Sequence, residues 1–170
     1  KLGKKNYKLY NNPSGNTLAV DFEDPESWDD LHTTEMHLPV GRPVKLVINA
    51  MDVIHDVGLS HFRMKMDAVP GLPTHLWLIP TITTDSMKKI THDPDFVYEL
   101  SCDQLCGKGH SAMRATIFVD THDEYVKWLS SQKSYYETTI KGTCEDPNSD
   151  CFKKRQQLKE EEKQKEEEKE

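Results

Sequence analysis

Short runs of alternating apolar and polar residues, separated by proline and glycine turns, fill residues 34–120 and leave few architectures open. The clearest run is 44–50 (VKLVINA), whose alternate residues are apolar, as in a half-buried strand. Pro70 and Gly71 mark a turn between two further runs. Many short strands with turns between them predict an all-β sandwich or barrel. The strands expected are 17–22, 34–38, 44–50, 57–62, 64–69, 75–79, 96–102 and 114–120.

Helical patterns are scarce by comparison. Thr121 and Glu124 have the spacing of a capping box, and apolar residues follow at helical spacing, which predicts a helix over residues 121–132. A short helical turn is expected at 83–90. Residues 153–170 are almost entirely Lys, Glu and Gln and cannot build a core, so they predict a solvated helix or a disordered tail. We therefore expect a domain at 1–140 and a polar extension at 141–170.

The charge of the chain restricts its partners. Its 170 residues carry a formal net charge of -7, and the Lys/Glu-rich end contributes none of it. An acidic body disfavours nucleic acid, whose phosphates require cationic contacts, and suits a basic protein partner. Six acidic residues lie within residues 21–30. This segment could form a docking face for a basic partner or a solvated loop, and the sequence does not decide between the two. No apolar stretch approaches the roughly 18 residues that a membrane-spanning helix needs.

Two cysteines, a histidine and a methionine fall within twelve residues, at Cys102, Cys106, His110 and Met113. Two glycines inside this segment supply the backbone freedom that a tight metal-binding loop needs. Thiolates combined with imidazole suit copper or zinc, and a methionine ligand favours copper. A second histidine is needed from elsewhere, and His55, which follows the clearest strand, is the best placed.

The spacing Cys-x3-Cys-x3-His-x2-Met resembles the copper-binding loop of the CuA domain of bacterial-type cytochrome c oxidase subunit II. Two upstream motifs match in the same order: Asp-Val-Ile-His at 52–55 and Asp-Ala-Val-Pro-Gly at 67–71. The likeness covers about 39–120. It implies a cupredoxin-like Greek-key β-sandwich, here with a short C-terminal helix and a charged tail.

The resemblance implies a binuclear copper centre with two bridging thiolates. Two coppers that share one unpaired electron change geometry little on reduction, which favours fast one-electron transfer. The implied ligands are Cys102 and Cys106 as bridges, His55 and Met113 on one copper, and His110 and the backbone carbonyl of Gln104 on the other.

The same resemblance implies a place in respiration. The domain would accept single electrons from cytochrome c, or from a cytochrome c domain, and pass them to haem in the large haem-copper subunit. The chain would thus serve an oxidoreductase, the proton-translocating cytochrome c oxidase, without carrying the oxygen chemistry. It would lie on the outer face of an energy-transducing membrane, in the bacterial periplasm or the mitochondrial intermembrane space. Asp52 is a candidate docking residue for a basic cytochrome.

Two departures from the family pattern concern magnesium binding and the connection to the membrane. Gln104 stands where most members have a glutamate that reaches a magnesium ion, and a neutral amide is a poorer ligand for a hard cation. The two transmembrane helices and the aromatic segment of the family do not precede Lys1. We therefore expect a fragment, an excised domain or part of a divided subunit, which meets the membrane through missing upstream helices or partner subunits.

Alternatives remain at this stage. A structural zinc site on His55, Cys102, Cys106 and His110 would use the same donors. The CuA domain of nitrous oxide reductase shares the loop spacing, although the Asp-Ala-Val-Pro-Gly motif favours the oxidase. Two further cysteines, Cys144 and Cys151, enclose a six-residue loop, and their spacing allows either a disulfide or two free thiols.

Overall fold

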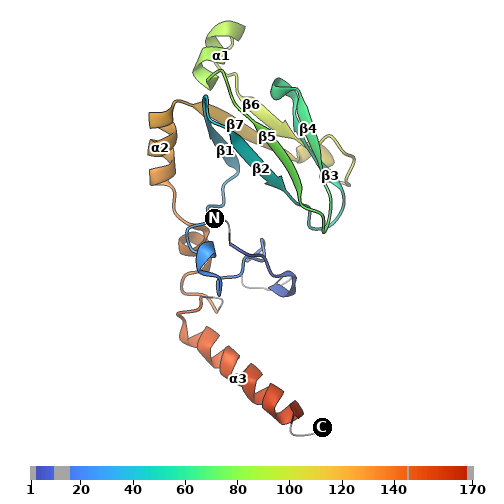
Figure 1. Ribbon diagram of the computed structural model, residues 1–170, viewed down its shortest axis with the longest axis vertical. Coiled ribbons are helices and arrows are strands. Elements are labelled where there is room, and N and C mark those ends of the chain that lie inside the picture. Colours follow the sequence, from blue (N-terminus) through green and yellow to red (C-terminus); the bar gives the residue numbers. More distant parts are fainter. Residues whose placement is uncertain (1–2, 10–15, 145, 168–170) are drawn as a thin grey trace. The chain divides into compact units, whose positions relative to one another are not determined.

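The computed structural model of the chain describes residues 3–9, 16–144 and 146–167, which form two compact units (Figure 1). One unit is residues 33–131; the other joins the residues up to 32 with those from 132 onward. The predicted boundary after residue 140 falls inside the second unit. Within the described ranges no helix is both long and apolar enough to cross a bilayer.

The unit of residues 33–131 contains seven strands in two sheets. Their bounds are Glu35–Pro39 (β1), Val44–Ile48 (β2), His55–Leu59 (β3), Met64–Ala68 (β4), Thr74–Leu78 (β5), Tyr98–Ser101 (β6) and Arg114–Asp120 (β7). The larger sheet has the order β1-β7-β6-β3-β4, and β2 pairs with β5 in the smaller one. Only β1 and β7 run parallel among the named pairs; the others are antiparallel. This architecture confirms the all-β, cupredoxin-like sandwich expected from the sequence.

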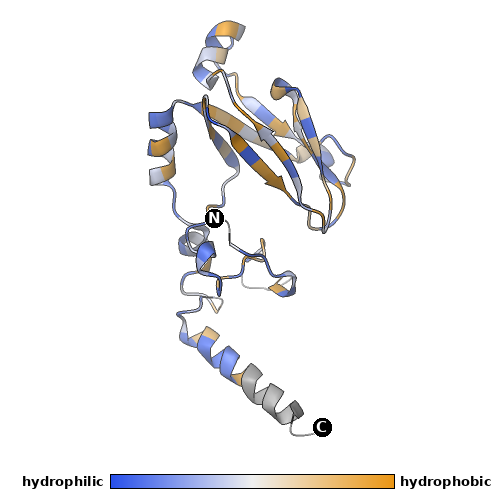
Figure 2. Cartoon of the chain, in the orientation of Figure 1, coloured by the Kyte–Doolittle hydropathy of each residue, from blue (hydrophilic) through white to orange (hydrophobic). Residues whose placement is uncertain are grey.

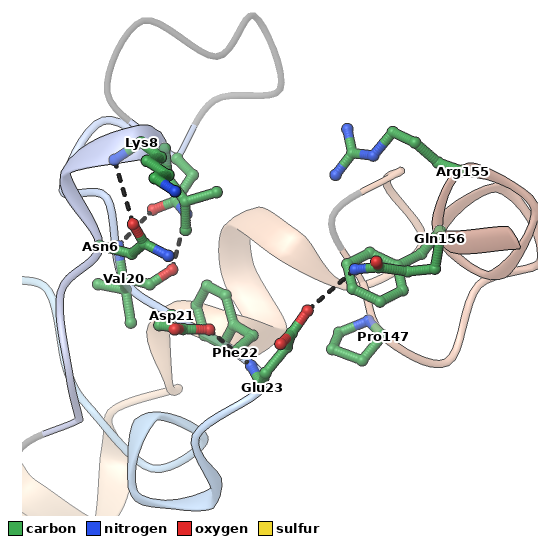
Figure 3. A pocket seen from close by; sticks show the side chains of 12 residues that line it. Asn6, Lys8, Val20, Asp21, Phe22, Glu23, Pro147, Arg155 and Gln156 are labelled. Atoms are coloured by element: carbon green, nitrogen blue, oxygen red, sulfur yellow. Dashed lines mark hydrogen bonds between the residues drawn. The ribbon is translucent and has the colours of Figure 1, made fainter. Parts of the chain in front are cut away.

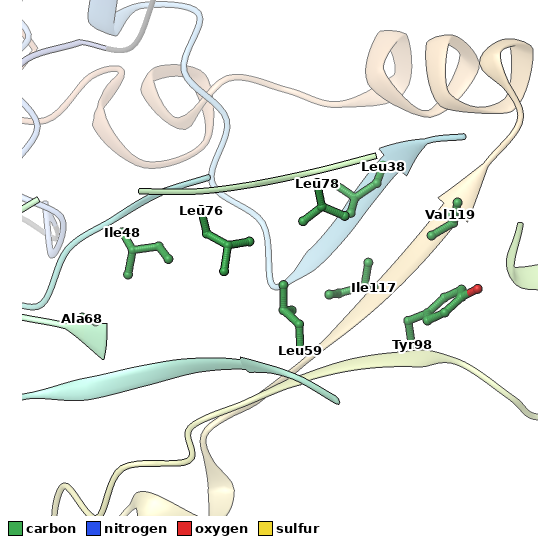
Figure 4. Close-up of a cluster of buried hydrophobic side chains, with 9 residues drawn as sticks. All are labelled: Leu38, Ile48, Leu59, Ala68, Leu76, Leu78, Tyr98, Ile117 and Val119. Carbon is green, nitrogen blue, oxygen red and sulfur yellow. The ribbon is translucent and has the colours of Figure 1, made fainter. Parts of the chain in front are cut away.

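The core lies between the two sheets. Figure 4 shows Ile48, Leu76 and Leu78 of the smaller sheet facing side chains of the larger one. Leu59 and Ile117 are almost wholly buried there. Each strand contributes through alternate residues, which explains why the period of two in the sequence predicted the strands after residue 34.

Two expected strands differ from the structure. Residues 17–22 form a turn with a single bridge between Lys5 and Val20, because Ala19 adopts a positive φ of 52° and reverses the chain. The strand expected at 57–62 begins earlier, at His55, and ends at Leu59. A 3-10 turn, Ser60–Phe62, follows it, and Arg63 adopts a left-handed φ of 53°.

Two helices flank the sandwich in this unit. Helix α1, Thr84–Thr91, is capped by Thr83, whose hydroxyl accepts a hydrogen bond from the Ser86 N–H at 3.2 Å. Helix α2, His122–Ser131, agrees with the predicted 121–132. Its expected capping residue Glu124 accepts a hydrogen bond from the Thr121 N–H at 2.9 Å. The short 3-10 helix His110–Ala112 lies between β6 and β7.

The second unit has its own small aromatic core. Val20 and Phe22 from the N-terminal segment pack with Tyr135, Tyr136 and Ile140 from the C-terminal segment. Its helical elements are the 3-10 turns Tyr7–Leu9 and Pro25–Ser27, the π-helix Tyr136–Ile140 and helix α3, Asp150–Glu167. Figure 2 shows that the coloured part of α3 is mainly hydrophilic, so its helical form matches the solvated helix expected from the charged tail.

A disulfide joins Cys144 to Cys151 in this unit, which resolves the alternative left open by the sequence. The enclosed loop is organised around Asp146, which is 6% exposed. Its carboxylate accepts hydrogen bonds from the Tyr136 hydroxyl at 2.8 Å and from the Asn148 and Gly142 N–H groups at 2.9 Å each. Burial alone would raise the pKa of Asp146, but these donors outweigh it and lower the pKa from its ordinary value.

Replacement of Asp146 by asparagine should therefore destabilise the protein in a pH-dependent way. A carboxylate with a lowered pKa in the folded state stabilises it above the ordinary pKa, and this contribution is lost as the pH falls. We expect the free energy of unfolding to fall by about 2 kcal/mol at neutral pH and the difference to shrink below about pH 4. Denaturant unfolding at several pH values measures this. Asp29→Asn, an exposed aspartate of the same unit, is the control, and a pH-independent loss would contradict the prediction.

Candidate metal centre

The loop from Cys102 to Met113 joins β6 to β7 and is closed at its base. The backbone N–H of Cys102 donates to the carbonyl of Met113 at 3.1 Å. Gly107 adopts a φ of 130°, which favours glycine, whereas Gly109 has a φ of -88° that other residues also adopt. Only one of the two loop glycines is therefore required by the backbone. The closed base brings both ends of the loop to the same edge of the sandwich.

Cys106 lies at the centre of the donor atoms. Its Sγ is 3.7 Å from the Sγ of Cys102 and 3.5 Å from Nδ1 of His110. The Sδ of Met113 is 3.4 Å away from it. The three other side-chain donors of the loop are thus all close enough to this thiol to share a metal ion with it.

Cys102 links the loop to the rest of the sandwich. Its Sγ is 3.2 Å from the backbone carbonyl of Gln104 and 3.9 Å from Nδ1 of His55, the first residue of β3. The donor atoms of His55, Cys102 and Cys106 all lie within 4.8 Å of one another. The structure therefore brings together all six side-chain and backbone donors that the sequence singled out.

A carboxylate orients the imidazole of His55. Asp52 places Oδ1 2.8 Å from Nε2 of His55. A carboxylate at Nε2 keeps the hydrogen there, so Nδ1 presents its lone pair toward Cys102. This hydrogen bond raises the pKa of His55 and lowers that of Asp52. Asp52 was expected as a docking residue, and the structure gives it a contact with the site as well.

The two thiols differ in their tendency to ionise. Burial would raise the pKa of Cys102, but hydrogen bonds with the backbones of Asp56 and Gln104 and with the imidazoles of His55 and His110 lower it to about 6. Burial raises the pKa of Cys106, and the neighbouring Cys102 raises it further. One thiolate is therefore present at neutral pH before any ion binds, and a bound cation would favour ionisation of the second.

Sequence reasoning missed the support behind the loop. Asp56 is 4% exposed, and neither of its carboxyl oxygens has a hydrogen-bond partner among the described residues. Burial raises its pKa, and the carboxylate of Asp67 on the paired strand raises it further. A Cβ added at Gly58 would lie 2.0 Å from Oδ2 of Asp103, so the loop packs directly on the β3 backbone. In the sequence, the only indication that Asp56 supports the site was its position directly after the candidate ligand His55.

The site lies at the surface beside a hollow of about 670 Å³, lined in part by His55, Cys106, His110 and Met113. Met113 is 41% exposed. Several exposed apolar side chains are close in sequence to the donor residues: Met51, Val53, Ile54 and Leu105. A partner could therefore approach the donor cluster closely.

The donor set fits soft or borderline metal ions. Atoms about 2.0–2.3 Å from one ion lie roughly 3.3–3.8 Å apart at tetrahedral angles, close to the separations around Cys106 and Cys102. Two thiols, two imidazoles and a thioether are ligands that copper prefers. Zinc sites use four ligands, so a set of six donors, with the two thiols among them, exceeds what one zinc ion needs. Two ions that share the thiolates would use the whole set.

Comparison with known proteins gives the family. Residues 30–120, more than half of the chain, match the family model described as cytochrome c oxidase subunit II, periplasmic domain. The chain is 34% identical over 122 residues to the alternative cytochrome c oxidase subunit 2 of Bradyrhizobium diazoefficiens, covering 71% of this chain and 40% of that protein. It is 36% identical over 94 residues to cytochrome c oxidase subunit 2 of Thermostichus vulcanus, covering 55% and 25%.

A solved structure, the periplasmic domain of subunit II (CoxB) of Bradyrhizobium japonicum, is 28% identical with a TM-score of 0.49, covering 58% of this chain and 62% of that one. The chain spans two fifths of the length of the first relative and a quarter of the second. The family match includes β1 to β7 and every residue of the candidate metal centre. The chain therefore belongs to the cytochrome c oxidase subunit II family, through its periplasmic domain.

Proposed function

We propose that residues 33–131 form an electron-transfer domain that holds a binuclear copper centre. The observation that carries this proposal is the convergence of four further donors, two imidazoles, a thioether and a carbonyl, on the two thiols, with donor separations of 3.2–3.9 Å. Cys102 and Cys106 would be shared between the ions. His55 and Met113 would serve one ion, and His110 and the Gln104 carbonyl the other. Such a centre, when bound, supplies one-electron storage with little change of geometry.

The residues of the chain prepare this site before binding. The Asp52 carboxylate fixes the ring of His55, and the loop base fixes the spacing of Cys102 and Met113. Preorganised ligands lower the cost of binding and resist change of geometry when the charge of the site changes. That resistance suits electron transfer better than catalysis at a substrate.

The proposed partners follow from family membership and from the surface. We propose a cytochrome c, or a cytochrome c domain, as donor and the large haem-copper subunit of a cytochrome c oxidase as acceptor. The exposed Asp52 carboxylate beside apolar side chains suits a basic, partly apolar partner face. The domain would lie on the outer face of the membrane that carries the oxidase. Gln104 offers only an amide side chain, so we do not assign magnesium to it.

Copper reconstitution tests this proposal. Chain purified without metal and titrated with copper under reducing conditions should bind two ions per chain, measured by elemental analysis. After oxidation its electron paramagnetic resonance spectrum should show a hyperfine pattern from one spin shared by two nuclei. Binding of a single copper, or preference for one zinc ion with no visible absorption band, would contradict the proposal and favour the zinc alternative.

Removal of the Asp52 carboxylate should weaken the centre without removing a ligand. Outer contacts of this kind are worth about tenfold or more in metal affinity. Asp52→Ala should weaken copper binding by about that factor, and Asp52→Asn, which keeps an acceptor oxygen, should weaken it less. Competition with a copper chelator measures both. Asp123→Ala, an aspartate of α2, is the control, and equal affinity of Asp52→Ala and wild type would refute this role.

A methyl group on Gly58 should disturb the loop from behind. Gly58→Ala would place Cβ against Asp103, the residue between Cys102 and Gln104, and overpacking of this kind costs about 1–3 kcal/mol. We expect lower stability and weaker copper binding, and the double variant Gly58→Ala/Asp103→Ala should recover both. Gly109→Ala, whose added Cβ meets nothing within 4 Å, is the matched control. Failure of the double variant to recover would show that the contact with Asp103 is not the cause.

A further inference from the structure

The unit that joins the two ends of the chain contains a pocket of about 320 Å³, apart from the metal centre. Its lining comes from the N-terminal segment and from the start of α3. Figure 3 shows Asn6, Lys8 and Val20 on one side and Pro147, Arg155 and Gln156 on the other. The volume is at the lower end of the range for small-molecule sites, about 300–1,000 Å³.

Apolar side chains supply much of the pocket surface. Val20 and Phe22 are 5% exposed and belong to the aromatic core of this unit. Pro147 and Phe152 add apolar surface from the disulfide loop and from α3, and Leu9 adds it from the N-terminal segment. A ligand with an apolar body would remove this surface from water at roughly 25 cal/mol per Å².

Two cations line the pocket, Lys8 and Arg155. Among the described residues, neither Lys8 nor Arg155 lies within 4.0 Å of a carboxylate. Arg155 is held over the ring of Phe152 at 5.8 Å, and its buried Nε has no hydrogen-bond partner in the described part of the chain. In Figure 3 its guanidinium extends from α3 toward the side that carries Lys8.

The acidic groups of the pocket are already engaged. Oδ1 of Asp21 accepts a hydrogen bond from the Glu23 N–H at 3.0 Å, and Oε1 of Glu23 accepts one from the Gln156 amide at 2.9 Å. The Gln156 contact also ties α3 to the N-terminal segment. The disulfide holds the start of the same helix, so the pocket exists before any ligand enters.

We propose that this pocket binds a small amphipathic monocarboxylate, with its carboxylate on Arg155 and Lys8 and its apolar chain over Phe22 and Phe152. A guanidinium accommodates a carboxylate with two parallel hydrogen bonds, and Lys8 adds a second positive charge to the lining of the same pocket. The nearby carboxylates of Asp21 and Glu23 disfavour a doubly charged phosphate. The proposal does not depend on copper or on electron transfer.

Decanoate is the probe that tests this site on the copper-loaded full chain. Amide chemical shifts of residues around the pocket should change in a saturable way during titration, and calorimetry should give a sub-millimolar dissociation constant. Arg155→Gln should weaken binding about tenfold, since it removes a charge-assisted pair. Lys154→Gln, an exposed neighbour on the same helix that does not line the pocket, should bind as wild type does.

Each other outcome would overturn the proposal. Equal binding of decanol would show an apolar pocket without anion recognition. Equal weakening in both variants would show general attraction to a charged surface, and absence of saturable binding would show no site. Should Arg155→Gln disturb the fold, as judged by circular dichroism, Lys8→Gln removes the second cation from an exposed position and must weaken decanoate binding selectively.

Discussion

Replacement of Cys106 by serine should leave the chain unable to hold two copper ions. Its thiol has the donor atoms of Cys102, His110 and Met113 at 3.4–3.7 Å, so its loss removes a contact with each of them. A hydroxyl is a hard, protonated ligand at neutral pH and cannot bridge soft ions as a thiolate does. We expect copper content to fall from two per chain to one or none, with loss of the shared-spin spectrum, measured by elemental analysis and electron paramagnetic resonance.

The chain supplies a matched control for this experiment. The double variant Cys144→Ser/Cys151→Ser makes the same chemical change in the other unit, where the cysteines form a disulfide. It should lose stability but retain two coppers per chain. Full copper loading of Cys106→Ser would exclude the shared-thiolate arrangement, and loss of copper in the control would show that the measurement reports folding and not ligation.

Truncation of Ile117 should cause the largest loss of stability among single core substitutions. Its side chain is 0% exposed at the centre of β7, between Met36 of β1 and Tyr98 of β6. Ile117→Ala removes buried methyl groups and leaves a cavity, which costs about 3–4 kcal/mol in a rigid core. Denaturant unfolding followed by circular dichroism measures the change in free energy.

The control for Ile117 is the same substitution on the surface. Ile79 is 47% exposed just after β5, and Ile79→Ala should change the free energy of unfolding by less than about 1 kcal/mol. Similar losses in the two variants would mean that the space between the sheets is not tightly packed around Ile117. A copper content of two in the Ile117 variant below its unfolding midpoint would further separate stability from ligation.

The sandwich was predictable because apolar and polar residues alternate within each of its strands, so each strand can be recognised from its own sequence. Strand β7 matches its prediction at both ends, since alternation runs from Arg114 to Asp120 and a capping box follows. Residues 17–22 show similar alternation but pack their apolar members, Val20 and Phe22, against tyrosines more than a hundred residues away. Local pattern cannot distinguish a strand from a segment whose apolar residues meet a distant cluster.

The residues of the candidate metal centre were predictable for a different reason. Ligand chemistry restricts the spacing within the loop, so the pattern from Cys102 to Met113 predicted a metal site. The need for a second histidine pointed to His55, which follows the clearest strand, and the family resemblance supported that choice. The residues that pack behind that loop follow no comparable sequence pattern. The buried carboxyl of Asp56 and the contact of Asp103 with Gly58 depend on how the loop lies on β3, which no residue pattern encodes.

The parallel pairing of β1 with β7 governs the order in which this domain can assemble. Glu35 pairs with Thr116, so the first strand waits until the last has been synthesised before the larger sheet can close. Contacts between residues so distant in sequence slow folding, because the intervening chain must be ordered first. The donor loop immediately precedes β7. The loop from Cys102 to Met113 is held between two strands only once β7 has joined the sheet, so we expect the candidate metal site to take its final form late in folding.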